Sequence, residues 1–358
     1  MNGPIHPPRS SRLGWTCLLL LCLAASGCVT SRMASNRIVE APNRRDSLGM
    51  NRTMRWFWAT LQTNFVELGS NGPLVRVTIP VGPPAAEIKA IEVPPHDYHV
   101  KWITWTNLAP HGRTNFFAAM VLETNAAPPF TAPDPPATIF LLHGYMLSKE
   151  TMLPWALMLA EAGYRVILVD LRGHGQSTGN FVYYGKHETA DLSQVLDYLQ
   201  ARGLCDNVVG VLGYSYGATL ALHWAAHDSR VRAVVALAPY NRLDDAFARL
   251  VRDLKIPITR RAAQKALALA AARLDLRWAD WSGEAAIRQV RVPVLLIRGG
   301  KDAICTPDDI TVLHNAAGGP SSTITIPMAN HDILPALPNL LADPVKAWFH
   351  AKMRNPPS

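Results

Sequence analysis

The feature that most constrains the fold of this 358-residue chain is an apolar segment that runs through a serine between two glycines into a helical segment. Residues 208–214 are typical of a buried strand, Ser215 follows, and residues 216–227 favour a helix. Gly213 and Gly217 stand two positions on either side of Ser215, where larger side chains would clash with backbone in a strained turn. Such a turn lifts the serine Oγ clear of a sheet, at a helix N-terminus that favours negative charge. A chance Gly/Ser turn is the alternative, and the flanking strand and helix argue against it.

Apolar strands alternate with helices from residue 138 onward. The expected strands are 138–143, 164–170, 208–214, 231–238, 292–298 and 322–326, and two earlier antiparallel strands are expected at 100–105 and 115–122. The expected helices are 151–162, 187–202, 216–227, 307–317 and a last helix that ends near Met353, with Asp343 and Pro344 as its cap and first turn. Near-continuous apolar strands between helices are typical of a parallel sheet that is covered on both faces. The sequence therefore predicts the α/β class, with a mostly parallel central sheet.

Residues 241–288 interrupt this alternation without contributing a strand. Their apolar residues recur at helical spacing, and 262–276 gives a second Ala/Leu-rich helix. The insertion follows the carboxyl end of a strand, which is the sheet edge where ligands bind, so a helical lid is favoured over a plain structural excursion. The predicted units are a signal peptide (1–27), an N-terminal extension (28–97), the first part of the core (98–240), the lid (241–288) and the second part of the core (289–358).

The N-terminus has the pattern of an export signal. Arg9 and Arg12 precede an apolar stretch at 13–25, which is too short to span a membrane, and small residues lead to Cys28. This junction resembles a bacterial lipobox, although Ala25 stands where Leu is usual. The resemblance implies export from a bacterial cytoplasm and a membrane anchor through lipidated Cys28. Ordinary secretion, to the periplasm or beyond, is the alternative.

Charge and cysteine content exclude several classes of partner. The formal net charge is +8, but the chain has no Lys/Arg run with interleaved aromatic residues, which argues against nucleic-acid binding. It has no C-x-x-C or His-rich pattern either, so no metal is expected. Cys205 and Cys305 are expected as two separate thiols, with a disulfide as the alternative. The sequence does not indicate the oligomeric state.

A serine nucleophile needs a base, and the base needs a carboxylate that orients it. Asp302 follows an apolar strand in a Gly turn, and His331 lies in the loop after the last strand. The chain therefore supplies Ser215, Asp302 and His331 in the order that a strand–serine–helix turn requires. Asp308 and Asp309 are alternatives, but they are expected to begin the next helix.

Two backbone N–H groups are expected to complete the site. Tyr145 follows His143 and Gly144 at the end of a strand, and Tyr216 follows the serine. Both N–H groups can point at a tetrahedral oxyanion, and losing one such donor typically costs about 2.7–4 kcal/mol. His143 is expected to brace this loop rather than act as a base.

With these residues, the chain resembles the α/β-hydrolase superfamily, and within it the lysophospholipase, monoacylglycerol-lipase and serine-aminopeptidase-like group. The residues that carry the resemblance are His143-Gly144, the 170–177 loop, the 213–217 turn, Gly300 to Asp302 with Pro307, and Asn330-His331. It implies the α/β-hydrolase fold, Ser215 as nucleophile, His331 as base, Asp302 as orienting acid, a structural role for 170–177, and no cofactor. Residues 29–85 fall outside it.

The leading hypothesis is a serine hydrolase that cleaves carboxylic esters, lipid esters among them, through an acyl-enzyme. Its substrate would be a small molecule or a lipid. Peptide or amide cleavage is the alternative within enzymes, and an amine-binding carboxylate in the lid, such as Asp244, Asp245, Asp253 or Asp280, would favour it. A non-catalytic binding protein on the same fold is the hypothesis of another class. The complete set of Ser215, Asp302 and His331 argues against it.

Overall fold

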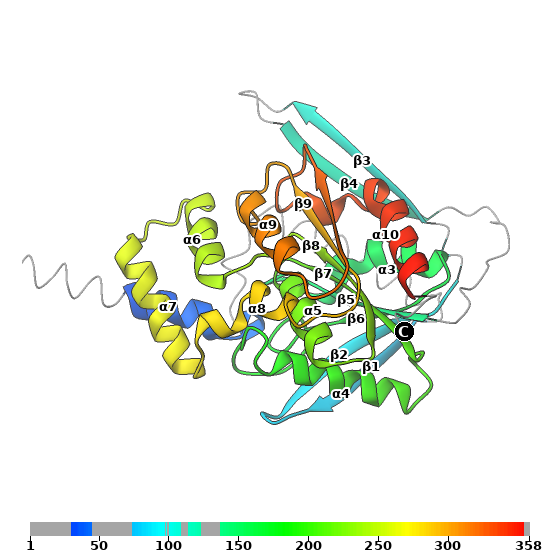
Figure 1. The fold of residues 1–358 in the computed structure, drawn as a ribbon, viewed down its shortest axis with the longest axis horizontal. Coiled ribbons are helices and arrows are strands. Elements are labelled where there is room, and N and C mark those ends of the chain that lie inside the picture. The colour runs from blue at the N-terminus through cyan, green and yellow to red at the C-terminus, as the bar shows by residue number, and fades with distance from the viewer. Residues whose placement is uncertain are drawn as a thin grey trace, which may run out of the picture.

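An eight-stranded sheet with helices on both faces forms the centre of the molecule (Figure 1). The computed structural model describes residues 30–44, 74–96, 98, 100–108, 114–122 and 137–353. In sheet order, the strands are β1 (Val75–Val81), β2 (Ala86–Val93), β6 (Arg165–Val169), β5 (Ala137–Leu142), β7 (Val208–Tyr214), β8 (Val231–Leu237), β9 (Val294–Gly299) and β10 (Ser321–Ile326). From β6 to β10 all neighbours are parallel, whereas β1–β2 and β2–β6 are antiparallel. The predicted α/β class and mostly parallel sheet are confirmed.

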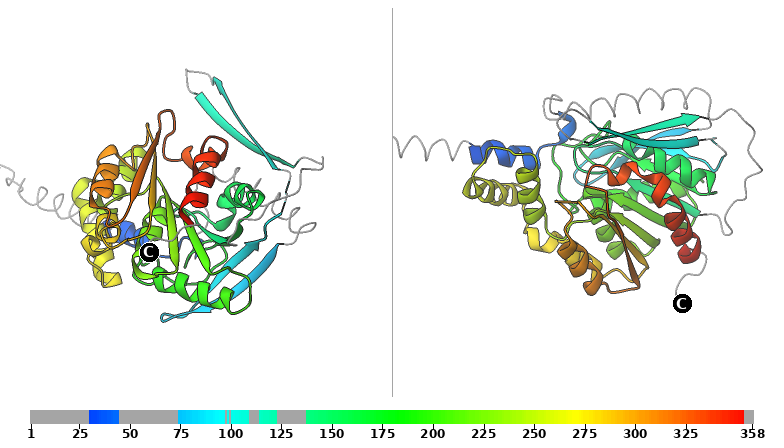
Figure 2. Two further views of the ribbon diagram at one scale, coloured as in Figure 1. Left: turned by 45° about the vertical axis from the view of Figure 1, so that its right-hand side comes forward. Right: turned by 90° about the horizontal axis from the view of Figure 1, so that it is seen from above.

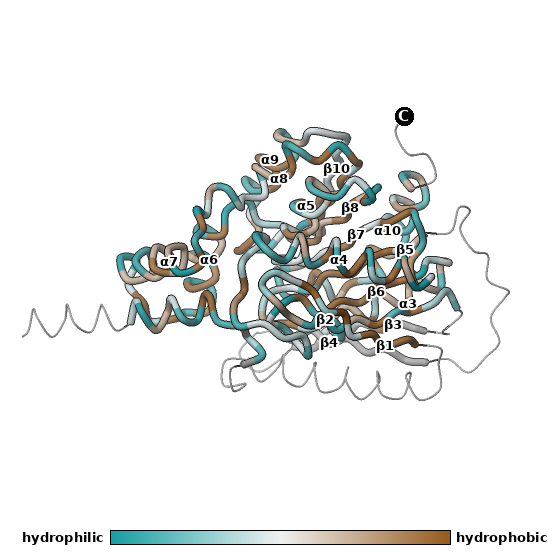
Figure 3. The backbone as a smooth tube through the Cα atoms, turned by 90° about the horizontal axis from the view of Figure 1, so that it is seen from below, coloured by the Kyte–Doolittle hydropathy of each residue, from teal (hydrophilic) through white to brown (hydrophobic). Residues whose placement is uncertain are grey.

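The helices cover the sheet in two layers. They are α3 (Leu153–Glu161), α4 (Glu188–Gln200), α5 (Tyr216–His227), α6 (Leu243–Asp253), α7 (Arg260–Leu274), α8 (Gly283–Ile287), α9 (Pro307–Ala316) and α10 (Pro338–Met353). α3 packs on β6 and α10 on β7 and β8, while α4 and α5 contact each other and the other face, with α8 packed on α5. Because both faces are covered, the central strands are buried throughout, and Figure 3 shows them in the brown of apolar residues.

The first two strands correct the predicted extension at 28–97. β2 pairs with β6 between Ala90 and Val93, so residues 75–93 belong to the central sheet. The prolines of this region mark its turns rather than a linker, because an antiparallel edge pair tolerates Pro80 and the hairpin places Pro83 and Pro84 between its strands. The predicted early strands do form an antiparallel pair, β3 (Val100–Leu108) and β4 (Thr114–Leu122), but this pair is a separate sheet.

The last helix also begins earlier than the sequence suggests. α10 starts at Pro338, and Pro344 lies inside it rather than in its first turn. Pro338 takes the first-turn position that proline favours, because the missing N–H has no helical partner there. Pro344 removes one interior hydrogen bond, to the carbonyl of Leu340, on a solvent-exposed part of the helix.

The lid region has the predicted helical character. Residues 241–288 hold α6, α7 and α8 and no strand. A further helix, at residues 30–39, lies beside α7 in Figures 1 and 2. The predicted signal peptide and Cys28 lie outside the described residues. Among the helices that are described, none is long and apolar enough to cross a membrane.

Candidate active site

Ser215 lies in the sharp turn that the glycines predict. It connects β7 to α5 with φ of 52° and ψ of −110°, a left-handed backbone that few side chains adopt. A Cβ on Gly213 would overlap the carbonyl oxygen of Gly217, and a Cβ on Gly217 would overlap that of Leu142. Glycine is therefore required at both positions, because the turn presses β7, α5 and the end of β5 together.

The structure brings Ser215, His331 and Asp302 into one hydrogen-bonded line. His331 Nε2 is 2.9 Å from Ser215 Oγ, and His331 Nδ1 is 2.8 Å from Asp302 Oδ2. The three residues follow β7, β10 and β9, so they meet at the carboxyl edge of the sheet. Nδ1–H donates to the carboxylate, which leaves Nε2 free to accept the serine proton.

Asp302 is held by the backbone of its own loop. Its Oδ1 accepts hydrogen bonds from the N–H groups of Ile304 and Cys305, each at 2.8 Å, so Oδ2 remains for His331. The alternative carboxylates lie elsewhere: Asp309 forms a capping box with Thr306 at the start of α9, where the sequence placed it. The aspartate that the sequence favours is thus the one that reaches the histidine.

His331 has a second support that the sequence did not indicate. The Tyr214 hydroxyl donates to the carbonyl oxygen of His331 at 3.0 Å, and the two rings lie 5.4 Å apart. Tyr214 is the residue before the serine, so the 213–217 turn positions both the nucleophile and the loop of its base.

Tyr145 and Tyr216 follow the carboxyl ends of neighbouring strands, β5 and β7. Tyr216 is the first residue of α5, so its N–H belongs to the turn whose donors have no partner within the helix. His143 is fully buried, and its Nε2 accepts from the N–H of Leu171 at 3.1 Å. Its Nδ1 then carries the proton and donates to the Gly144 carbonyl at 2.8 Å. Burial lowers the pKa of His143, which keeps it neutral as a brace of this loop.

The comparisons with known proteins fit this geometry. A family model described as X-Pro dipeptidyl-peptidase (S15 family) matches residues 96–250. The solved esterase Pf2001 of Pyrococcus furiosus superposes with a TM-score of 0.55 at 18% identity, over 78% of this chain and 93% of that one. The chain has the α/β-hydrolase fold. The fold that the sequence resemblance implied is confirmed.

Two sequence relatives match parts of this chain. Uncharacterized protein YqkD of Bacillus subtilis is 29% identical over 196 residues, which cover 53% of this chain and 63% of that protein. The thermostable monoacylglycerol lipase of Bacillus sp. (strain H-257) is 32% identical over 114 residues, which cover 32% of this chain and 44% of the lipase. The matched segments span less than two thirds of either relative.

A segment before the sheet contacts residues next to the candidate site, and the sequence did not indicate it. Residues 30–44, called the strap below, run past the loop that carries Tyr145. The Tyr145 hydroxyl donates to the carbonyl of Arg37 at 2.9 Å, and the Tyr184 hydroxyl donates to that of Ile38 at 2.6 Å. The strap therefore holds the side chain of Tyr145, whose N–H is predicted from the sequence to face the site.

Residues 39–43 of the strap are bound to the 170–182 region. Val182 N–H donates to the Val39 carbonyl at 2.9 Å, and Ala41 N–H donates to that of Asn180 at 3.0 Å. The Asn43 side-chain amide donates to the Ser177 carbonyl at 2.6 Å. The only sequence signal for this docking is the spacing of Ser31, Ser35, Ile38 and Val39, all buried, along one helix face.

The strap also contacts the lid. Arg273, near the end of α7, donates to the side-chain oxygen of Asn36 at 2.8 Å. Trp278 of the lid packs edge-on against Tyr184 at 5.5 Å, and Tyr184 packs against Tyr216 at 5.8 Å. A continuous series of aromatic contacts thus connects Tyr216, the residue after Ser215, to the lid.

The described residues contain no cluster of His, Cys, Asp and Glu that could hold a metal ion. Cys205 and Cys305 are buried and not bonded to each other, as two separate thiols. Burial raises the pKa of the Cys205 thiol to about 12, so it is not poised as a nucleophile.

Proposed function

We propose that this protein is a serine hydrolase that cleaves carboxylic esters, lipid esters among them, through an acyl-enzyme intermediate. The observation that carries the proposal is the continuous line from Asp302 through His331 to Ser215, with hydrogen bonds of 2.8 and 2.9 Å. A binding protein on the same fold would not need these three hydrogen-bonded side chains for its stability, because ordinary loop contacts would serve as well. The line therefore argues against the non-catalytic alternative.

The chemistry follows from the positions of these atoms. His331 Nε2 takes the Ser215 proton as Oγ bonds to the ester carbonyl carbon, and the N–H groups of Tyr145 and Tyr216 stabilise the resulting oxyanion. The intermediate collapses, the C–O bond to the alcohol breaks, and His331 returns the proton to the leaving alcohol. Water then attacks the acyl group, with His331 as base, and releases the acid and free Ser215. Asp302 keeps the imidazole in the correct tautomer and stabilises its charged form.

The arginine partners of two lid carboxylates argue against a peptidase that uses them, while Asp253 has no ion-pair partner among the described residues. A peptidase that reads a free amino terminus needs a carboxylate available to that amine. Asp244 is bound by Arg242 at 2.6 Å, and Asp280 is bound by Arg277 at 2.8 Å. The similarity to a monoacylglycerol lipase and to a solved esterase agrees with ester cleavage, whereas the match to the S15 family model keeps peptide cleavage as the second candidate.

A fluorophosphonate probe tests the nucleophile. We expect a covalent adduct on Ser215 of the folded protein, no adduct in Ser215→Ala, and full labelling of the matched control Ser322→Ala, which changes an exposed serine on β10. Absence of the adduct in folded wild type would end the proposal. Kinetics on p-nitrophenyl esters of rising chain length, beside aminoacyl anilides, then separate esterase from peptidase activity.

The proposal extends to location. We expect export from a bacterial cytoplasm and anchoring through lipidated Cys28, because several acyl chains on one residue give stable membrane attachment. Mass spectrometry of the mature N-terminus tests this. An unmodified Cys28, or cleavage at another residue, would instead indicate a periplasmic or secreted protein.

A further inference from the structure

The turn between α6 and α7 has an unusual surface. Residues 252–261, called the lid tip below, carry four Lys or Arg residues and one Asp. Leu254 and Ile256 are 57% and 46% exposed within it. A single exposed apolar side chain is ordinary, but two of them one residue apart, with Lys255 between them, form an apolar point with a cationic rim.

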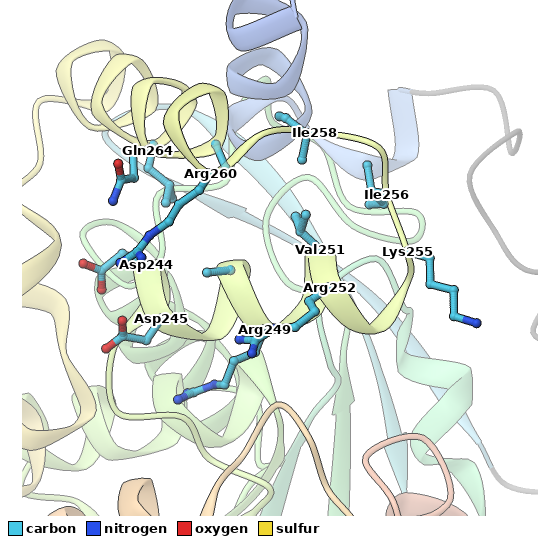
Figure 4. A pocket seen from close by; sticks show the side chains of 13 residues that line it. Asp244, Asp245, Arg249, Val251, Arg252, Lys255, Ile256, Ile258, Arg260 and Gln264 are labelled. Atoms are coloured by element: carbon cyan, nitrogen blue, oxygen red, sulfur yellow. The ribbon is translucent and has the colours of Figure 1, made fainter.

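A groove lies directly behind the tip. The cavity between α6 and α7 has a volume of about 860 Å³ (Figure 4). Its apolar wall and its cations are Val251, Ile256, Ile258, Leu267, Arg249, Arg252, Lys255 and Arg260. Figure 4 shows Lys255 pointing outward from the turn and Arg260 extending across the groove toward α6. Asp244 and Asp245 also line the groove, so it offers apolar surface together with four cations and two carboxylates.

The positive charge of this region is only partly compensated. Arg249 is paired with Asp309 at 2.8 Å, and Asp244 is paired with Arg242. Across the residues that the structure describes, no carboxylate lies within ion-pair distance of Arg252, Lys255 or Arg260. Three cations on long side chains surround exposed apolar side chains. Such a surface is complementary to one that is both anionic and apolar.

The strap reaches the same end of the molecule. Its helix, which is described from residue 30 onward, lies beside α7, at the end that the lid forms in Figures 1 and 2. Met33 of this helix is 64% exposed, and Arg32 is exposed next to it. Position 28 is two residues before the described helix, so the chain leads from the predicted lipidation site to the lid.

We infer that the lid tip and its groove are the surface on which this protein contacts an anionic phospholipid bilayer. Leu254 and Ile256 enter the interface between head groups and acyl chains, and Arg252, Lys255 and Arg260 lie at the level of the lipid phosphates. The role that we assign to this surface, delivery of lipid esters to Ser215, rests on the proposed function. Its test measures binding and does not depend on catalysis.

Co-sedimentation with vesicles tests the surface. The protein is the full-length chain with Cys28→Ala, so that no acyl chain contributes, and the remaining N-terminal residues are common to all variants. The vesicles contain either phosphatidylcholine alone or phosphatidylcholine with phosphatidylglycerol, and the readout is the ratio of the two partition coefficients. We expect this ratio to be about 100-fold at 0.1 M salt, because each of the three cations contributes roughly a fivefold factor, and to fall as salt rises.

Two double variants divide the surface into its parts. Since each cation near an anionic membrane contributes roughly a fivefold factor, K255E/R260E should lower the ratio about 25-fold or more. L254S/I256S should lower partitioning into both kinds of vesicle about tenfold or more, without changing the ratio. The matched control is R202E/R291E, which makes the same charge change on exposed arginines near the amino ends of β7 and β9.

The control decides between a local surface and overall charge. If R202E/R291E lowers the ratio as much as K255E/R260E, or if wild type does not prefer phosphatidylglycerol, the inference is wrong. It is also wrong if L254S/I256S binds like wild type, or if these residues instead mediate a dimer that the variant abolishes in sedimentation. All four proteins should hydrolyse a soluble ester at the wild-type rate. Absence of that activity in all four, with vesicle binding following the expected pattern, would count against the proposed function alone.

Discussion

The two sides of the site are held in place in different ways. Asp302 is fixed by N–H groups two and three residues further along the chain, and Ser215 is fixed by glycines two residues away. Tyr145, on the oxyanion side, is fixed through its hydroxyl by the strap, 108 residues earlier in the sequence. The backbone of Ser215 and the carboxylate of Asp302 are therefore held mainly by nearby residues, whereas Tyr145, the proposed oxyanion donor, is held by a distant segment that leads toward the predicted membrane anchor.

The largest expected effect comes from the locally held side. Asp302→Asn preserves the shape of the loop but offers His331 an amide, which favours the wrong imidazole tautomer. We expect kcat on a soluble ester to fall about 10⁴-fold with little change in KM. Asp308→Asn, an exposed carboxylate in the first turn of α9, is the matched control and should behave as wild type. A loss smaller than about tenfold in Asp302→Asn would remove Asp302 from the mechanism.

The second largest expected effect is on stability, and it concerns Gly217 in the turn that holds Ser215. Gly217→Ala places a Cβ against the backbone of Leu142 and His143, which cannot move without shifting β5. We expect the free energy of unfolding to fall by at least about 3 kcal/mol in urea titration. Gly203→Ala is the control, because Gly203 has a positive φ of 67° but no atom within 4 Å of the added Cβ. It should cost only about 1 kcal/mol, and equal costs at both sites would show that crowding is not the reason for Gly217.

This contrast also explains what the sequence could predict. The sheet, the lid insertion and the Ser215–Asp302–His331 set follow from local patterns whose order the fold fixes, so each could be assigned from periodicity and motif. β1 and β2 were missed because prolines at their turn resemble a linker, and their pairing with β6 is a contact between distant segments. The strap was missed for the same reason: its bonds to Tyr145 and Ser177 use backbone carbonyls, which carry no sequence signal.

A smaller effect is expected where the strap meets the oxyanion loop. Tyr145→Phe removes the hydroxyl that binds the Arg37 carbonyl and leaves the ring contacts and the Tyr145 N–H in place. We expect kcat to fall about tenfold and KM to stay within about twofold, because a slight displacement of the loop weakens a donor that acts mainly in the transition state. Unfolding free energy should fall by only about 1 kcal/mol.

The control for this prediction is Tyr183→Phe, which removes a tyrosine hydroxyl from the neighbouring loop and should leave kcat unchanged. A variant Tyr145→Phe that loses stability but keeps its wild-type kcat would show that the strap supports the fold and not the oxyanion site. The comparison between the two sides of the site would then apply to folding alone.

The smallest expected effect concerns the contact between α5 and the lid. His223 of α5 is buried with its ring 5.1 Å from that of Trp281, which ends the lid's last 3₁₀ turn. Burial lowers the pKa of His223 from 6.5 to about 4. Between these values the unfolded chain binds a proton that the folded protein does not, so the free energy of unfolding falls as pH decreases below about 6.5.

At pH 5.5 this linkage should cost about 1 kcal/mol relative to pH 7.5. Other groups titrate in the same range, so the measurement is a difference of differences: the change in unfolding free energy between the two pH values, in wild type and in His223→Gln. The variant should be less stable at pH 7.5 but lose about 1 kcal/mol less on acidification. An equal loss in both proteins would mean that His223 is already accessible to protons in the folded state. The lid would then pack on α5 less tightly than the contacts of the strap and the aromatic residues indicate. Local determination of the site would extend no further than the 213–217 turn.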